Sequence, residues 1–310
     1  MNAITCTQVT KTFGDLKALD QVTLSFEEGK IYGLLGRNGA GKTTLARLLC
    51  ALEQPQSGNI TINTIPVARQ RANGNMQSLK RADREKLRAT IGYVMQHPER
   101  QLFAETVAED IAYGPRNQHL DETQVSERVN QAMTLLHIEH LADRSPFDLS
   151  GGQQRLAAIA GIIACQPQIL IMDEPTAGLD PKERVRFRNL ISDFAKEKIV
   201  ILSTHIVSDV SYIADTILMM KDGTFLLQEP MATVTDSING KVWELLVRDR
   251  EAAEYSNRFS VVNLHHENGK VRLRMIHDTA PTADAITVPP SLEDLFLYHF
   301  GEEAGEERGE

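Results

Sequence analysis

Residues 36–43 read Gly-Arg-Asn-Gly-Ala-Gly-Lys-Thr, the pattern G-x-x-x-x-G-K-[ST] of a phosphate-binding loop. Glycines let the backbone turn so that several N–H groups point at one anion, and the helix behind the loop adds the positive end of its dipole. Lys42 offers a mobile positive charge to the outer phosphates, and Thr43 offers a hydroxyl to Mg²⁺. An apolar strand over 31–35 and a helix over 41–52 are the context that this loop requires.

A second signal lies at the end of another apolar stretch. Residues 169–172 read Ile-Leu-Ile-Met and predict a buried strand that delivers Asp173 and Glu174 to its carboxyl end. Asp173 can hold Mg²⁺ directly or through water. Glu174 alternates to the other face, where it can polarise an attacking water. Because apolar strands that end in acids are common, this pattern gains its meaning from the phosphate loop.

Residues 149–155, Leu-Ser-Gly-Gly-Gln-Gln-Arg, precede an apolar run over 156–165. Ser150 and the N–H groups of Gly151 and Gly152 predict a second anion cradle at a helix N-terminus. An ordinary serine N-cap before a glycine-rich turn is the plainer interpretation. Since one nucleotide does not need two cradles, we expect the second to serve a nucleotide held by a partner copy.

The first 230 residues alternate short β-branched runs with helical stretches, which favours an α/β sheet with a parallel core. Strands are expected over 31–35, 91–95, 169–172, 199–202 and 217–220, and helices over 41–52, 122–136 and 181–194. The basic stretch 69–88 is interpreted as a solvated helix face, with contact to an anionic membrane surface as the alternative.

The pattern changes after about residue 235. Small strands are predicted over 241–247, 259–264 and 271–276, followed by a short helix over 291–300 with Ser291 as its N-cap. We therefore expect a nucleotide-binding domain over 1–230, a small α+β module over 235–300 and a disordered acidic tail over 301–310.

Composition excludes several classes of protein. Hydrophobic residues make up 42% and charged residues 24% of the 310 residues, as in ordinary globular chains rather than collagenous or disordered ones. The net charge of −9 argues against a nucleic-acid partner. Cys6, Cys50 and Cys165 are far apart, which favours reduced, packed thiols over a disulfide framework or a metal site. The longest apolar run, 156–165, is well short of the ~20 residues of a membrane span, and the first residues lack a signal pattern.

Taken in order, these motifs resemble the ATP-binding subunit of an ABC transporter over nearly all of residues 3–230. Residues 149–153 match the signature motif of that family. The resemblance implies a P-loop NTPase fold of the ABC-cassette type, with an antiparallel β piece near the start and a helical subdomain at about 97–160. It also implies an ATPase that uses ATP and Mg²⁺ to power transport, at the cytoplasmic face of the cell membrane.

Further positions match the family one by one. Phe13 matches the aromatic residue that stacks on adenine, although a plain core aromatic is the alternative, and Gln96 matches the glutamine that senses Mg²⁺ and the attacking water. Asp180, in Gly178-Leu-Asp-Pro, matches the loop that connects the two sites, and His205 matches the histidine that contacts the γ-phosphate. The implied sets are Lys42, Gln96, Glu174 and His205 for catalysis; Phe13, Gly36, Asn38, Gly39, Gly41, Lys42, Thr43, Thr44, Ser150, Gly151, Gly152, Gln153 and Asp180 for the nucleotide; and Thr43, Gln96 and Asp173 for the metal.

The resemblance implies a head-to-tail dimer in which each ATP lies between the phosphate loop of one subunit and Ser150 and Gly152 of the other. Bound ATP then closes the dimer, and hydrolysis removes the bridging charge and lets it open. The implied partners are a transmembrane permease or coupling subunit and a second ATP-binding subunit, identical or related, with no nucleic acid.

The kind of transporter is left between two alternatives. Residues 96–114 and 144–152 resemble the ATPases of energy-coupling factor importers, which take up vitamins and metal ions. Residues 32–39, 203–210 and 290–300 resemble those of drug and antibiotic exporters, so that a drug, antibiotic or peptide exporter is the alternative.

The segment after Gln96 favours import. In this family that segment and the helical subdomain form the groove for the membrane partner's coupling helix, with Leu102, Phe103 and Val107 expected as apolar anchors. The importer-like residues lie in this segment. A soluble ABC ATPase that acts on ribosomes or DNA is a remote alternative, because this chain carries one cassette and no long coiled-coil insertion.

Overall fold

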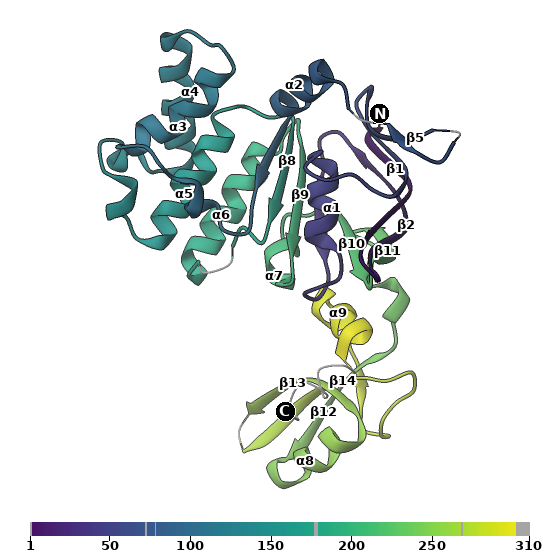
Figure 1. Ribbon diagram of the computed structural model, residues 1–310. Coiled ribbons are helices and arrows are strands. Elements are labelled where there is room, and N and C mark those ends of the chain that lie inside the picture. Colours follow the sequence, from purple (N-terminus) through teal and green to yellow (C-terminus); the bar gives the residue numbers. More distant parts are fainter. Residues whose placement is uncertain (1, 72, 78, 177–178, 268, 302–310) are drawn as a thin grey trace. The chain divides into compact units, whose positions relative to one another are not determined.

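The computed structural model describes residues 2–71, 73–77, 79–176, 179–267 and 269–301 (Figure 1). The chain forms two compact units, Met1–Gln228 and Glu229–Glu310. The acidic tail expected over 301–310 lies outside the described residues, apart from Gly301.

A six-stranded sheet forms the centre of the first unit, in the order β11-β10-β3-β9-β8-β7 among the described residues. Its strands are β3 (Ile31–Leu35), β7 (Ile91–Val94), β8 (Ile169–Asp173), β9 (Ile199–Thr204), β10 (Thr216–Lys221) and β11 (Thr224–Pro230). The pairs from β10 through β7 are parallel, and β3, β8 and β9 are buried at every residue. Parallel strands buried on both faces need continuous apolar runs, which explains why the sequence located them. Their carboxyl ends meet at one edge, which positions the residues that follow them.

A second sheet is antiparallel, as the resemblance implied for the start of the chain. It has the order β2-β1-β4-β5-β6, with β1 (Asn2–Phe13), β2 (Leu16–Glu27), β4 (Ser57–Ile62), β5 (Ile65–Gln70) and β6 (Met76–Gln77). The β1–β2 turn is tight and pairs Phe13 with Leu16. That turn holds the Phe13 ring at a surface and not in the core.

Helices surround the central sheet. They are α1 (Lys42–Leu49), α2 (Arg81–Thr90), α3 (Val107–Asn117), α4 (Glu122–Leu136), α5 (Gly151–Ile163), α6 (Pro181–Phe194) and the short α7 (Val207–Val210). In Figure 1, α3, α4 and α5 form a group beside the sheet, where the helical subdomain was expected. The bounds of α4 and α6 agree with prediction because Asp121 and Asp180 begin them with capping boxes, a local signal that the sequence carries.

The prediction of one helix face over 69–88 is wrong in its first half. Arg69 and Gln70 end β5 and pair with β6, and only α2 is helical. A β-hairpin therefore occupies the stretch before residue 78, and its cross-strand pairing outweighs the charge pattern that suggested a continuous helix. Ala72 and Ser78 lie outside the described residues.

The second unit contains a four-stranded sheet in the order β13-β14-β12-β15 over its described residues. Its elements are β12 (Val242–Arg248), α8 (Asp249–Arg258), β13 (Ser260–Glu267), β14 (Lys270–Ile276), β15 (Ile286–Thr287) and α9 (Leu292–Phe300). Ser291 caps α9 as predicted, by accepting a hydrogen bond from the Asp294 N–H at 3.2 Å. Helix α8 was not predicted, because Ala252 is its only buried residue and gives no apolar period.

Asp294 is a buried carboxylate of this unit, only 2% exposed. Arg274 donates to it through Nε at 2.9 Å and Nη2 at 2.7 Å. Burial acts to raise the pKa of Asp294, but hydrogen bonds from Arg274 and Ser291 outweigh burial and hold that pKa below its ordinary value of 3.8. Because the pKa of Asp294 is lower in the folded protein, the ionised carboxylate stabilises the fold fully at pH values above 3.8. This stabilisation is lost as the pH falls through the lowered pKa of the folded protein.

We expect Asp294→Asn to lower the free energy of unfolding of this unit by about 2 kcal/mol at neutral pH, because a charge-assisted pair is lost. Trp243, the single tryptophan of the chain, lies on β12, so its fluorescence during denaturant unfolding measures this unit. The deficit should shrink only as the pH falls below 3.8 and through the lowered pKa, because Asp294 of the parent protein then becomes protonated as well. Asp278→Asn, which removes an exposed partner of Lys241, should change stability by less than about 0.5 kcal/mol. An Asp294→Asn deficit that is equal at neutral pH and below the lowered pKa would contradict the ionic role.

Candidate nucleotide site

A cavity of about 380 Å³ opens at the carboxyl edge of the central sheet. Its lining comes from the β1–β2 turn and strand β2, the phosphate loop with the start of α1, and the segments after β7 and β8: Phe13, Leu16, Ala18, Asn38, Gly39, Ala40, Gly41, Lys42, Thr43, Thr44, Gln96 and Glu174. The fold thus brings together residues that are far apart along the chain. Most of these residues were predicted from the sequence to bind the nucleotide.

The phosphate loop requires its glycines. Gly41 is the N-cap of α1 with a φ of +105°, and a Cβ there would lie 2.4 Å from the Ala18 carbonyl oxygen. A Cβ on Gly36 would lie 2.5 Å from the Met220 carbonyl oxygen. Gly41 has no side chain with which to cap α1, so in the described structure the first backbone N–H groups of this helix are available to an anion.

Lys42 reaches back over this loop. Its side chain is 6% exposed, and Nζ donates to the carbonyl oxygens of Gly36 at 2.8 Å and Arg37 at 3.0 Å. Burial lowers the pKa of Lys42, while the nearby charges of Glu174 and Asp173 act to raise it. The ammonium group is therefore held where a phosphate on the loop would meet it.

Glu174 supplies a buried carboxylate to the same cavity. The residue is 5% exposed, and its φ of +50° is unusual for a side chain of this size. Its Oε1 lies 3.8 Å from Lys42 Nζ, and its Oε2 lies 2.9 Å from His205 Nδ1. The contact with Lys42 is too long for a hydrogen bond and the contact with His205 does not form one, so both oxygens lack a hydrogen-bond partner within the described part of the chain. Such a group can accept hydrogen bonds from a bound water.

Asp173 lies behind this surface, at the end of β8. It is 1% exposed and accepts a hydrogen bond from Ser203 Oγ at 3.1 Å. Thr43 stands exposed in the first turn of α1, and Gln96 lines the cavity. A carboxylate, a hydroxyl and an amide oxygen are the hard ligands that Mg²⁺ prefers, so the chemistry of this set fits that ion.

Phe13 forms one rim of the cavity. Its side chain is 47% exposed, and Lys11 Nζ lies 4.8 Å from the ring centroid. The alternative that Phe13 is a plain core aromatic is therefore wrong. An exposed ring beside a phosphate site offers a flat surface to a base.

The second cradle does not line this cavity. Ser150 is the N-cap of α5: its Oγ accepts from the Gln153 N–H at 3.3 Å, and Gln153 Oε1 accepts from the Ser150 N–H at 3.1 Å. The plainer N-cap interpretation thus holds, and it is compatible with anion binding because a Cβ on Gly151 would meet no atom within 4 Å.

Asp180 also lies outside the cavity. It caps α6 and accepts a hydrogen bond from the Glu183 N–H at 2.7 Å. Gly178, quoted with it in the same loop, is outside the described residues. Asp180, the residue predicted to connect the two sites, is thus placed at the start of α6, and its role in that connection stays a prediction.

Sequence reasoning missed Arg155. This residue is 6% exposed in α5, and its guanidinium group contacts the segments that carry Gln96 and Glu174. The sequence could have indicated it, because an arginine near the N-terminus of a largely apolar helix interacts unfavourably with the helix dipole. Such a residue is expected to make a specific contact elsewhere.

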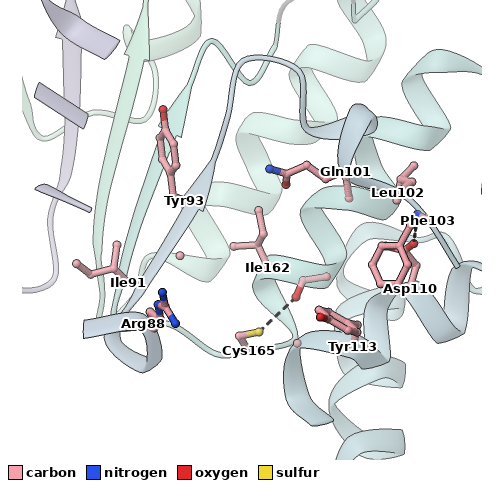
Figure 2. A pocket seen from close by; sticks show the side chains of 14 residues that line it. Arg88, Ile91, Tyr93, Gln101, Leu102, Phe103, Asp110, Tyr113, Ile162 and Cys165 are labelled. Atoms are coloured by element: carbon pink, nitrogen blue, oxygen red, sulfur yellow. Dashed lines mark hydrogen bonds between the residues drawn. The ribbon is translucent and has the colours of Figure 1, made fainter. Parts of the chain in front are cut away.

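A second cavity, of about 340 Å³, lies between the segment after β7 and the helical subdomain (Figure 2). Leu102 and Phe103 line it as predicted, and the Phe103 ring meets Tyr113 edge to face at 4.9 Å. Asp110 fixes the loop by accepting from the Phe103 N–H at 2.8 Å. Val107 is fully buried and does not line the cavity, so its prediction as an anchor is wrong. Val107 is the first residue of α3, and because its side chain is fully buried it is not available to a partner.

Comparison with known proteins gives consistent results. The family model described as ABC transporter matches residues 19–177. Energy-coupling factor transporter ATP-binding protein EcfA2 of Clostridium tetani is 39% identical over 227 residues, which is 72% of this chain and 75% of that protein. A Bifidobacterium longum protein, whose name gives ABC transporter ATP-binding protein as an unproven assignment, is 48% identical over 238 residues. That match covers 74% of this chain but only 30% of the longer relative.

Two solved structures of ABC ATP-binding proteins are similar to this chain. The cbiO1 structure from Clostridium perfringens, part of the ABC transporter complex cbiONQ, has a TM-score of 0.68 at 30% identity and covers 83% of this chain and 95% of its own. The ATP-binding cassette MJ0796, in a dimeric post-hydrolysis state with ADP and phosphate, has a TM-score of 0.65 at 26% identity and covers 74% of this chain and 98% of its own. Every helix of the described residues is too short or too polar to cross a membrane.

Proposed function

Because this chain belongs to the ABC transporter family of ATP-binding, ATP-hydrolysing subunits, we propose that it powers the uptake of a vitamin or a metal ion through a membrane partner of the energy-coupling factor type. The observation that carries the catalytic part is the buried Glu174 carboxylate, which shares one cavity with the phosphate loop and lacks hydrogen-bond partners among the described residues.

Each group at the cavity has a proposed task. The loop amides and Lys42 hold the phosphates, and Phe13 stacks on the base. Glu174 accepts the proton of an attacking water, with His205 beside it at 2.9 Å. Mg²⁺ would be held by Thr43, Asp173 and Gln96, and when bound it neutralises charge on the phosphoryl oxygens.

The start of α5 is proposed to complete a partner's site. Ser150 and Gly152 are outside this chain's own cavity. Ser150 and Gly151 are exposed, whereas Gly152 is half-buried and a Cβ there would lie 3.0 Å from Glu183 Oε1. The exposed part of this helix N-terminus suits a phosphate. A second copy or a related ATP-binding subunit, placed head to tail, would bring its γ-phosphate to this cradle. Asp180, at the start of α6, is proposed to connect the two sites.

Uptake is preferred to export because the relative from Clostridium tetani carries an energy-coupling factor name. The groove in Figure 2 is the proposed seat of the membrane partner, since Leu102, Phe103 and Tyr113 give it apolar walls. Seated there, the subunit would lie peripherally on the cytoplasmic face of the membrane.

Purification of the tagged chain from membranes of its own host tests this proposal. A small transmembrane coupling protein among the bound proteins would support uptake, and a six-helix permease would support export instead. Phe103→Glu should release the membrane partner by placing a charge in the apolar groove, whereas Phe147→Glu, at an exposed aromatic outside the lining, should not.

We expect Phe13→Ala to raise the KM for ATP roughly threefold to tenfold, because a stacked aromatic contact contributes about 0.5–1.5 kcal/mol. The kcat should change little, since Phe13 touches no reacting group. Steady-state ATPase kinetics measures both values. Phe147→Ala, at an aromatic that is 65% exposed and outside the cavity, is the matched control and should leave KM unchanged.

A further inference from the structure

Arg155 joins three parts of the first unit through one buried group. It lies one turn after the N-cap Ser150 of α5. Its Nη2 donates to the carbonyl oxygen of Gln96 at 2.7 Å and to that of Glu174 at 2.8 Å. These two residues follow the neighbouring parallel strands β7 and β8 and both line the nucleotide cavity.

Burying the Arg155 charge at this position costs free energy, so the contacts that it makes there need a physical reason. Only 6% of Arg155 is exposed, and a positive charge near a helix N-terminus opposes the helix dipole. Burial lowers the pKa of Arg155, while the charges of Glu99 and Glu174 act to raise it. The guanidinium group stays charged, and its planar shape fixes the directions of the two N–H bonds of Nη2, whereas an ammonium carries its donors on a flexible stem.

The two carbonyl groups lie where the pairing of β7 with β8 has ended, and on the other side the Glu174 N–H still donates to the Ser203 carbonyl oxygen at 2.9 Å. Gln96 and Glu174 both stand just past the ends of their strands, beyond the last paired residues Val94 and Asp173. Arg155 holds the carbonyl groups of both residues to α5, and for Glu174 this contact adds to the N–H bond to Ser203.

We propose that Arg155 is a positioning residue that keeps Gln96 and Glu174 in register with α5, so that the cradle offered to a partner's nucleotide is mechanically coupled to this chain's own catalytic groups. This inference rests on the proposed roles of Gln96, Glu174 and Ser150. Closure of a partner on Ser150 would move α5, and Arg155 would carry that movement to the carboxylate and the amide.

Arg155→Met tests the inference in the full chain. The kcat of ATP hydrolysis should fall at least tenfold, while the Kd for a fluorescent ATP analogue stays within twofold because the phosphate loop is untouched. Arg128→Met is the matched control. Arg128 also holds backbone from within the helical subdomain, through Nη1 to the Cys165 carbonyl at 3.3 Å, but neither Cys165 nor Gln118, its two hydrogen-bond partners in the described chain, lines the nucleotide cavity. It should lower Tm without changing kcat well below that temperature.

Hydrogen exchange gives a readout that a merely stabilising arginine would not move. In Arg155→Met the amides over 96–102 and 174–176 should exchange faster, while those of α4 keep their parent rates. If Arg155→Met does not fold, Arg155→Lys replaces it: the charge is kept, the fixed planar arrangement of donors is lost, and kcat should still fall about threefold.

A parent-like kcat together with parent-like exchange in a folded Arg155 variant would overturn the inference. The proposed function is judged separately by Glu174→Gln: normal turnover in that variant would overturn the role of Glu174 whatever Arg155 does. Slow turnover in Glu174→Gln with normal turnover in Arg155→Met would reject the inference alone.

Discussion

Glu174→Gln should lower the kcat of ATP hydrolysis by about 10² to 10⁴-fold, the usual contribution of a general base, while ATP binding stays within threefold. The amide keeps the shape of the side chain but cannot accept the proton of an attacking water. The parent carboxylate is poised for this step because it is 5% exposed and its two oxygens lack hydrogen-bond partners within the described chain. Single-turnover hydrolysis and a fluorescent-nucleotide titration measure the two quantities.

The same variant should accumulate a closed dimer when ATP is present, because the bridging phosphate is no longer removed. Size-exclusion chromatography with and without ATP detects it. Glu53→Gln is the matched control: it neutralises a half-buried carboxylate that pairs with Lys11 and Arg47 outside the cavity, and its turnover should stay near the parent value. Turnover in Glu174→Gln within threefold of the parent would refute the base assignment.

Ser150→Arg should abolish the ATP-dependent dimer and leave ATP binding to the single chain intact. An arginine at the N-cap of α5 fills the space beside Gly151, where a Cβ now meets nothing within 4 Å. The cradle for a partner's phosphate is thereby closed. In the Glu174→Gln background the dimer peak should disappear, and in the parent background hydrolysis should fall to the level of an isolated subunit.

Loss of the serine cap by itself costs about 1 kcal/mol, so a control must separate folding from docking. Asp121→Arg provides it, because Asp121 begins α4 with the same kind of capping box, closed by Gln124 as Ser150 is closed by Gln153. Asp121→Arg should lower Tm to a similar degree and keep the dimer. A Ser150→Arg protein that still dimerises with ATP would refute the second cradle.

The local parts of the nucleotide site were predictable because short-range physics fixes them. The phosphate loop must turn, cap a helix and leave amides free, and only glycines at positions such as Gly41 permit this. Helices α4 and α6 were located because an acid caps each one at its start. The hairpin within 69–88 and the helix α8 were missed, because cross-strand pairing and packing on a neighbouring sheet decided them, not local period or charge.

By itself the sequence determined which groups could bind phosphate, activate water and cap helices, since these properties depend on residue type and spacing over a few positions. Only the tertiary structure decided which of those groups meet. Arg155 contacts the carbonyl of a residue 59 positions away. Glu174, just after β8, stands beside His205, just after β9, and beside Lys42 at the start of α1. Such contacts arise when parallel strands align their carboxyl ends at one edge, and that alignment is a property of the assembled sheet that no single segment encodes.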